Sequence, residues 1–159
     1  VVWRQVRDRG LTVEPLQLQA EAPTADVAAA IAKTSGDIVF LDSFVSEAAL
    51  RALYAAADGV LANSEKEPFG LVGLEVMACA GIAFVGRTGE DYAMPYGNAV
   101  VVQTDDPREL ATHLAYMRDH PGLAERVRAE GQATAERFAW PRIIEALEAT
   151  WEAAARLGK

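Results

Sequence analysis

The stretch from Gly59 to Cys79 constrains the fold of this chain more than any other part of the sequence. It opens with a short apolar run, Gly59 to Asn63, which is typical of a buried strand in a parallel sheet. A polar segment follows, and after Pro68 apolar residues recur at helical spacing. These apolar residues are Leu71, Leu74, Met77 and Ala78. The stretch therefore predicts a strand, a tight loop and a helix in succession.

The predicted loop is suited to holding a ligand. Gly70 allows another molecule to approach the backbone closely, because glycine has no Cβ. The first N–H groups of the following helix have no intrahelical partner, and they carry the positive end of the helix dipole. We therefore expect this turn to hold an anion or a row of hydroxyl groups.

Two carboxylates frame the predicted turn. Glu67 lies in the loop and Glu75 lies in the helix, with seven residues between them. If both were helical, the rise between them would be roughly 12 Å at about 1.5 Å per residue, about the span from a ribose to a sugar across a diphosphate. Each carboxylate can accept hydrogen bonds from both hydroxyl groups of a vicinal diol. The alternative is two solvated glutamates, which fits Glu75 less well because its neighbours Leu74 and Val76 are apolar.

Short apolar runs alternate with amphipathic stretches along the rest of the chain. Besides the run at 59–63, strands are predicted at 11–20, 38–41, 82–86 and 99–103. Helices are predicted at 24–34 with Thr24 as cap, at 47–57 with Ser46 as cap, and from Asp105 or Asp106 to the end, with breaks at 120–122 and 139–141. This alternation predicts an α/β fold, a Rossmann-like parallel sheet with helices on both faces.

Composition limits the classes of partner. The 159 residues suit one domain with a sizeable core, and their net charge is −8, from 15 basic and 23 acidic residues. This charge argues against binding of nucleic acid or anionic lipid by the domain as a whole, although a local basic patch stays open. The single cysteine, Cys79, excludes an internal disulfide, and the cytoplasm is the default compartment. No apolar run reaches the roughly 18 residues of a membrane span.

Other candidate chemistry has little support in the sequence. His113 and His120 have no cysteine or paired carboxylate at ligand spacing, so no metal site is predicted. A Gly-x-Gly-x-x-Gly segment is absent, which argues against an ordinary NAD-binding site. We expect Trp140 and Trp151 to pack the terminal helices. Three arginines are interpreted as a solvated face: Arg126, Arg128 and Arg137.

The segment Glu67-Pro-Phe-Gly-Leu-Val-Gly-Leu-Glu75-Val-Met-Ala78 resembles the signature of a known family. Retaining, nucleotide-sugar-dependent glycosyltransferases of the two-Rossmann-domain (GT-B) architecture, family 4, carry the pattern Glu-x-Phe-Gly-Leu-x-x-x-Glu-x-Met-Ala. The likeness extends from the segment 40–45 to the segment 138–140 and covers roughly residues 10 to 155. Residues 1–159 thus resemble the donor-binding C-terminal domain of such an enzyme, with 140–159 as its terminal helix.

The resemblance implies a nucleoside diphosphate sugar as donor. Glu75 would accept hydrogen bonds from the ribose hydroxyls. Glu67, the candidate catalytic residue, would accept them from sugar hydroxyls as a positioning and charge-stabilising group, although an older view makes it the nucleophile. Retention of anomeric configuration is usually explained by attack of the acceptor on the front face of the sugar, assisted by the leaving diphosphate. That mechanism requires no cofactor and no metal ion.

Backbone groups complete the site that the resemblance implies. The amides of Phe69, Gly70 and Leu71 would hold the sugar and the distal phosphate. Backbone groups around Phe44 and Val45 would face the base. The identity of the base, the sugar and the acceptor stays open, and so does the oligomeric state.

Part of the family's machinery does not match this sequence. In the family, the C-terminal domain begins with a central strand and a loop that brings an Arg and a Lys to the donor diphosphate, whereas residues 1–6 resemble the helix that follows them. We therefore expect this piece to lack the first central strand, this phosphate clamp and the acceptor-holding N-terminal domain, and to be inactive alone. What lies upstream of Val1, and whether it supplies the Arg and the Lys, stays open. Two alternatives stay open, a GT-B-like sugar-nucleotide epimerase and a non-catalytic scaffold domain. An upstream Arg and Lys would favour the transferase.

Overall fold

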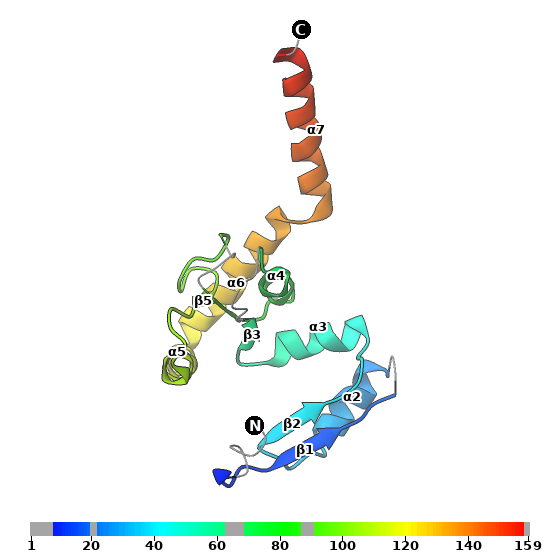
Figure 1. Cartoon of the computed structure of the whole chain (residues 1–159), viewed down its shortest axis with the longest axis vertical. Helices are drawn as coiled ribbons and strands as arrows, with labels where there is room; N and C mark the ends of the chain where they lie inside the picture. Colours follow the sequence, from blue (N-terminus) through cyan, green and yellow to red (C-terminus); the bar gives the residue numbers. More distant parts are fainter. Residues whose placement is uncertain (1–7, 20–21, 63–68, 87–90, 158–159) are drawn as a thin grey trace. The chain divides into compact units, whose positions relative to one another are not determined.

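The computed structural model describes residues 8–19, 22–62, 69–86 and 91–157 (Figure 1). Contacts divide the chain into two compact units, Val1–Leu53 and Tyr54–Lys159, and each has its own parallel strands. Strands alternate with helices along both units, which confirms the predicted α/β class.

The first unit pairs two strands in parallel. Its elements in chain order are β1 (Val13–Leu16), α2 (Thr24–Ile31), β2 (Ile38–Leu41) and most of α3 (Glu47–Ala56). Val13 lies opposite Ile38, and Leu16 lies opposite Leu41. A small buried core gathers residues from the segment before α2, from α2 and from α3: Ala22, Val27 and Ala49.

The second unit contains a parallel sheet of three strands in the order β3-β4-β5. Its strands are β3 (Val60–Ala62), β4 (Ala83–Val85) and β5 (Val100–Val101). Its helical residues begin with the last three of α3, from Tyr54 to Ala56. Its further helices are α4 (Leu71–Ala78), α5 (Pro107–Asp119), α6 (Pro121–Arg137) and α7 (Trp140–Leu157).

The central strand of this sheet buries both of its faces. Successive residues of a strand point to opposite sides of a sheet. Val85 of β4 accordingly belongs to a buried cluster with Val76 and Met77 of α4. Phe84 belongs to a separate cluster with Met117 of α5. Helices therefore cover both faces, as predicted, and such a strand reads as a continuous apolar run in the sequence.

Helix starts agree with the capping residues expected from the sequence, with one exception. Ser46 and Asp106 precede α3 and α5, and each accepts a hydrogen bond from a backbone N–H of the first turn, at 3.3 and 2.9 Å. The prediction of Thr24 as a cap is wrong, because α2 begins at Thr24 itself. Pro23 occupies the N-cap position, where the φ that its ring imposes suits the extended backbone (φ −55°, ψ 147°).

Arg128 is not part of a solvated face, so the sequence interpretation of this residue is wrong. Its guanidinium donates to the carbonyl oxygens of Ala57 (3.0 Å) and Ala80 (2.8 Å), just beyond the ends of α3 and α4. A cation at this place satisfies terminal carbonyls and opposes the negative ends of both helices. Arg126 and Arg137 are exposed, as expected.

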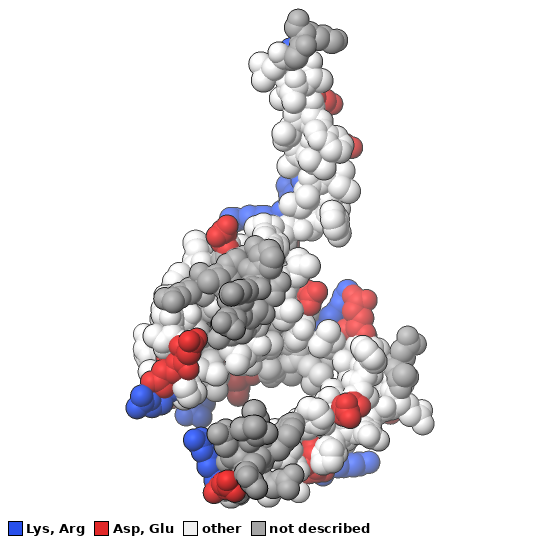
Figure 2. Space-filling view, viewed as in Figure 1, with Lys and Arg blue, Asp and Glu red and all other residues white. Residues whose placement is uncertain are grey.

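Helix α7 buries none of its residues. Trp140 is 76% exposed and Trp151 is 64% exposed, so the prediction that they pack the terminal helices is wrong. The visible face of α7 is largely uncharged (Figure 2). An apolar stripe in a sequence identifies a face that can be buried, but it does not identify the surface that buries it. Among the described residues, no helix combines the length and the apolar character needed to cross a membrane.

Candidate functional site

Gly70 enters α4 with a backbone conformation that favours glycine. Its φ is 73° and its ψ is 58°, in the left-handed region that costs other L-residues roughly 1–2 kcal/mol. Gly70 is the N-cap of α4, so the N-cap residue has no side chain that could accept from the first turn. The first turn of α4 also carries no acidic residue. This helix thus begins without the capping chemistry that α3 and α5 have.

Helix α4 turns a narrow face outward. Its buried residues are Gly73, Leu74, Val76 and Met77. Leu71 and Glu75, one turn apart, are both exposed, Leu71 by 62%. The apolar neighbours of Glu75 point inward and do not shield it, so they give no reason to prefer a ligand-binding Glu75 over a solvated one. The exposure of Glu75 agrees equally well with a solvated glutamate and with a glutamate that binds a ligand.

Tyr54, near the end of α3, lies close to Glu75. Burial raises the pKa of the Tyr54 hydroxyl, and the negative charge of Glu75 raises that pKa further. Tyr54 therefore stays protonated at neutral pH and can donate a hydrogen bond. The outer face of α4 thus pairs an accessible carboxylate with a neutral phenol nearby.

Tyr92 organises the entrance to α4, and the sequence analysis missed it. Its hydroxyl donates to the Gly70 carbonyl (2.5 Å), and only 7% of the residue is exposed. Its ring meets those of Phe69 and Phe138 edge-on, with centroids 5.7 and 5.8 Å away. A Cβ on Gly73 would lie 2.4 Å from the Tyr92 hydroxyl. That glycine, inside an apolar helix, was the signal in the sequence that a close approach occurs here.

The structure brings together part of the predicted site. Phe69, Gly70 and Leu71 form the entrance to α4, and Glu75 follows one turn later. Glu67 lies outside the described residues. Phe44 and Val45 belong to the other unit, between β2 and α3, where Phe44 is 89% exposed and Val45 packs against the small core. Their contact with a base stays a prediction.

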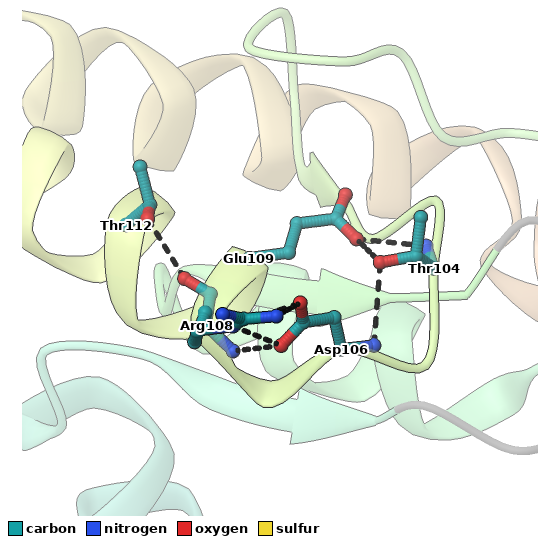
Figure 3. A network of polar contacts seen from close by, with 5 residues as sticks. All are labelled: Thr104, Asp106, Arg108, Glu109 and Thr112. Carbon is teal, nitrogen blue, oxygen red and sulfur yellow. Dashed lines mark hydrogen bonds and ion pairs between the residues drawn. The ribbon is translucent and has the colours of Figure 1, made fainter.

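The turn from β5 into α5 is closed by its own side chains (Figure 3). Glu109 accepts hydrogen bonds from the Thr104 hydroxyl (2.5 Å) and from the N–H groups of Gln103 (2.8 Å) and Thr104 (2.7 Å). These bonds, led by that of the Thr104 hydroxyl, lower the pKa of Glu109 to about 2. Arg108 pairs with the N-cap Asp106 at 2.7 Å. The donors of this turn are thus taken up internally.

The two histidines have structural partners. His113 lies with Nδ1 2.5 Å from the Tyr96 hydroxyl and with Nε2 3.4 Å from the Glu109 carboxylate. His120 stands between α5 and α6, and its ring lies 4.1 Å from that of Tyr116. Within the described ranges, no group of three or more potential metal ligands occurs.

The described residues of the α4 entrance offer groups that can bind a ligand. Backbone N–H groups at a helix N-terminus suit an anion, and an accessible carboxylate suits a pair of hydroxyls. In open parallel sheets, ligands bind outside the carboxyl ends of the strands, and the entrance follows the carboxyl end of β3. The arrangement can therefore hold a molecule that carries both a phosphate and a diol.

Known proteins with similar sequences and folds agree with this description. The profile of the family described as "Glycosyl transferases group 1" matches residues 28–134, more than half of the chain. A D-inositol 3-phosphate glycosyltransferase of Thermobispora bispora is 35% identical over 118 residues, which is 73% of this chain and 27% of the relative. The chain spans about a quarter of the length of the curated relatives that it matches.

Two solved structures illustrate the likeness in fold. The sucrose-phosphate synthase of Thermosynechococcus elongatus matches with a TM-score of 0.67 and 21% identity, over 90% of this chain and 38% of that one. Anabaena HepE in complex with UDP-glucose matches with a TM-score of 0.64 and 16% identity, over 96% of this chain and 52% of that one.

Proposed function

The chain belongs to the group 1 glycosyl transferases, and on that premise we propose that it forms the donor-binding domain of a retaining, GT-B-type transferase. The donor is a nucleoside diphosphate sugar, held at the entrance to α4. The observation that carries the proposal is the uncapped helix that follows a parallel strand through a left-handed glycine, Gly70. The HepE complex with UDP-glucose supports a nucleotide sugar as the ligand class and makes uracil the first base to test.

Each part of the donor has a partner in this proposal. The amides of Phe69, Gly70 and Leu71 hold the distal phosphate and the sugar. Glu75 accepts hydrogen bonds from the ribose hydroxyls, which its exposure on α4 allows. Glu67 accepts them from sugar hydroxyls and stabilises the positive charge that develops on the sugar ring. The backbone around Phe44 and Val45 faces the base.

The proposed chemistry exchanges one bond to the anomeric carbon for another. The acceptor hydroxyl attacks on the face from which the nucleoside diphosphate departs, and its proton passes to a phosphate oxygen of the leaving group. Configuration is therefore retained without a protein nucleophile. The negative charge that develops on the leaving diphosphate is stabilised by the amides at the N-terminus of α4, and the reaction requires no metal ion or cofactor.

The N-terminal domain of the same protein is the proposed partner, and α7 is the proposed contact. Two facts support it: α7 buries none of its residues, and the chain spans about a quarter of its curated relatives. The contact stripe is Ile143, Ile144, Leu147 and Trp151. Hydrogen exchange should protect residues 143–151 in the full-length protein and not in the isolated chain. Protection in the isolated chain equal to that of β4 would contradict the contact.

A thermal-shift screen of UDP-, GDP- and ADP-sugars on the full-length protein tests the function. We expect one base series to raise Tm and to support glycoside formation, with NMR of the product giving the same anomeric configuration as the donor. Epimerised sugar nucleotide without transfer would indicate the epimerase alternative, and binding without turnover would indicate a scaffold. Whichever outcome the full-length protein gives, the isolated chain should show no turnover. The cytoplasm, where nucleotide sugars are made, is the proposed location.

A further inference from the structure

We infer that Tyr92 is a positioning residue for the donor diphosphate, acting through the peptide between Gly70 and Leu71. The inference rests on the proposed function, because it concerns the same turn. Tyr92 lies in the connection between β4 and β5, 22 residues beyond Gly70. Its hydroxyl nevertheless donates to the Gly70 carbonyl at 2.5 Å, in a buried setting.

This hydrogen bond sets the direction of a backbone donor. The peptide is planar and trans, so the Gly70 carbonyl and the Leu71 N–H point in opposite directions. A hydrogen bond that fixes the carbonyl therefore also fixes the direction of the Leu71 N–H. This N–H is the first of α4 and has no partner within the helix. Gly70 itself supplies little restraint, because a residue without Cβ moves readily between backbone conformations. The hydrogen bond from the Tyr92 hydroxyl therefore keeps the Leu71 N–H in one direction.

Gly73 makes room for the Tyr92 hydroxyl. A Cβ built on Gly73 would lie 2.4 Å from that hydroxyl and 2.9 Å from a methyl of Val85, distances that real Cβ atoms do not show. Glycine inside a helix costs about 1 kcal/mol relative to alanine, so its presence here needs a reason. The reason that the geometry offers is access of the hydroxyl to the carbonyl one turn earlier.

Tyr92 is also fixed from its other side. Asn98, which is 1% exposed, donates through Nδ2 to the Tyr92 carbonyl (2.9 Å) and to the Thr134 hydroxyl of α6 (2.9 Å). Its Oδ1 accepts from the Met94 N–H (2.7 Å). A buried, satisfied network of this kind rigidifies what it holds. The first peptide of α4 is thus tied through Tyr92 and Asn98 to α6.

A purely structural tyrosine would have a different signature from a positioning residue. Loss of packing or of a core hydrogen bond lowers stability and weakens every ligand alike. Loss of aim at the Leu71 N–H weakens only ligands that carry the distal phosphate. A nucleoside monophosphate reaches Glu75 through its ribose but lacks that phosphate, so it separates the two cases.

The test compares Tyr92→Phe with the parent in the full-length protein by calorimetry. The probes are UDP, GDP and ADP and the matching monophosphates, with the base chosen by the parent's own affinity. We expect Tyr92→Phe to weaken diphosphate binding about tenfold, or about 1.4 kcal/mol, and to leave monophosphate binding within about twofold. Tyr96→Phe is the matched control: it removes a tyrosine hydroxyl bonded to His113 and should change neither affinity.

A second variant addresses the same hydroxyl from the other side. Gly73→Ala pushes it away from Gly70, so it should also weaken diphosphate binding, and by less when Tyr92→Phe is already present. This variant carries the test if Tyr92→Phe does not fold. Parent-like diphosphate affinity in Tyr92→Phe, or an equal loss for monophosphate, overturns the inference while the proposed function stands. A parent that binds no nucleoside diphosphate overturns the proposed function itself, and the role of Tyr92 with it.

Discussion

Two turns of the second unit lead from a parallel strand into a helix, and they differ in what they do with their donors. The turn from β5 to α5 has an Asp106 cap, a proline at the first helical position and the Glu109 carboxylate on three donors. Helix α4, which follows β3, has Gly70 as its N-cap and no acidic residue in its first helical turn. Among the described residues, Tyr92 donates to the Gly70 carbonyl, which is an acceptor and not an N–H donor.

The difference separates a turn built for stability from one suited to a ligand. At the turn from β5 to α5, the Glu109 carboxylate already accepts hydrogen bonds from the donors and occupies the position that a phosphate would need. At Gly70 no side chain of the N-cap residue competes for the first N–H groups. The turn from β2 to α3 resembles the closed type, since Ser46 caps it. Helices α2 and α6 also lack a side-chain cap, so what sets α4 apart is the left-handed Gly70 together with the family motif.

A carboxylate cap at the start of α4, like the one that Asp106 gives α5, should have the largest effect on donor binding. Gly70→Asp places a carboxylate where the diphosphate is proposed to bind. We expect nucleoside diphosphate affinity to fall at least about a hundredfold, since charge repulsion adds to the loss of free N–H groups. Gly70→Asn, which has the same shape without the charge, should lose less. Equal losses in the two variants, measured by calorimetry, would mean that charge repulsion contributes nothing and that capped N–H groups or backbone strain cause the loss.

Removing the charge of one glutamate in α4 and of one in α5 tests which of the two helices contacts the donor. Glu75→Gln should weaken diphosphate binding about tenfold to a hundredfold, because a hydrogen bond to a charged group contributes about 1.5–3 kcal/mol. Sugar-nucleotide binding should weaken by the same factor, since the ribose is common to both ligands. Glu109→Gln should leave both affinities unchanged. If Glu75→Gln binds diphosphate as tightly as the parent, the ribose assignment fails.

Glu67→Gln should show the reverse selectivity. The proposed contact is with the sugar, so diphosphate affinity should stay nearly unchanged while sugar-nucleotide binding and turnover fall. Titration of the same full-length variant with both ligands makes the comparison. A loss of diphosphate affinity as large as that of Glu75→Gln would place Glu67 elsewhere on the donor.

The closed turn should show its role in the pH dependence of stability. The pKa of Glu109 is about 2 in the folded chain, below the ordinary value of 4.5. Its contribution is therefore present above about pH 4.5 and is lost as the pH falls through about 2. Glu109→Gln should lower Tm by a few degrees at pH 7, and the difference from the parent should shrink between pH 4.5 and pH 3. A difference independent of pH would mean that the carboxylate charge is not involved.

The smallest expected effect concerns the far end of α4. Ala80 has a φ of 55°, a left-handed conformation that alanine adopts at a cost. Ala80→Gly should raise the free energy of unfolding by about 0.5–1 kcal/mol, after the greater entropy of glycine in the unfolded chain is taken into account. Ala78→Gly, in the last turn of the helix, should lower it by a similar amount. Chemical denaturation of the two variants against the parent measures both.

Local signals in the sequence predicted much of this fold. Asp106 followed by proline marked the start of α5, and the apolar runs marked the strands, because a cap or a buried strand depends on a few adjacent residues. The breaks at 120–122 and 139–141 fell where α6 and α7 begin. The entrance to α4 was predicted from Gly70 and the spacing of the apolar residues that follow it.

Contacts between distant parts of the chain were not predicted. Tyr92 reaches a carbonyl 22 residues away, and Arg128 reaches one 48 residues away. A tyrosine in a loop or an arginine on a helix has no periodicity that reveals its partner. The prediction for Trp140 and Trp151 was wrong for the same reason, because an apolar face does not identify the surface that covers it. The exposure of Glu75 likewise depended on which way α4 faces the sheet.

Hydrogen exchange on the full-length protein, with and without the nucleoside diphosphate sugar selected by the thermal-shift screen, shows which of the two turns binds the donor. In the proposed function, the turn from β3 to α4 (the open turn) holds the donor, and the turn from β5 to α5 (the closed turn) does not. We predict that ligand slows exchange of the amides at 69–73, at the entrance to α4, and leaves those at 104–110 unchanged. Protection at 104–110, or none at 69–73 while the ligand is bound, would contradict the account.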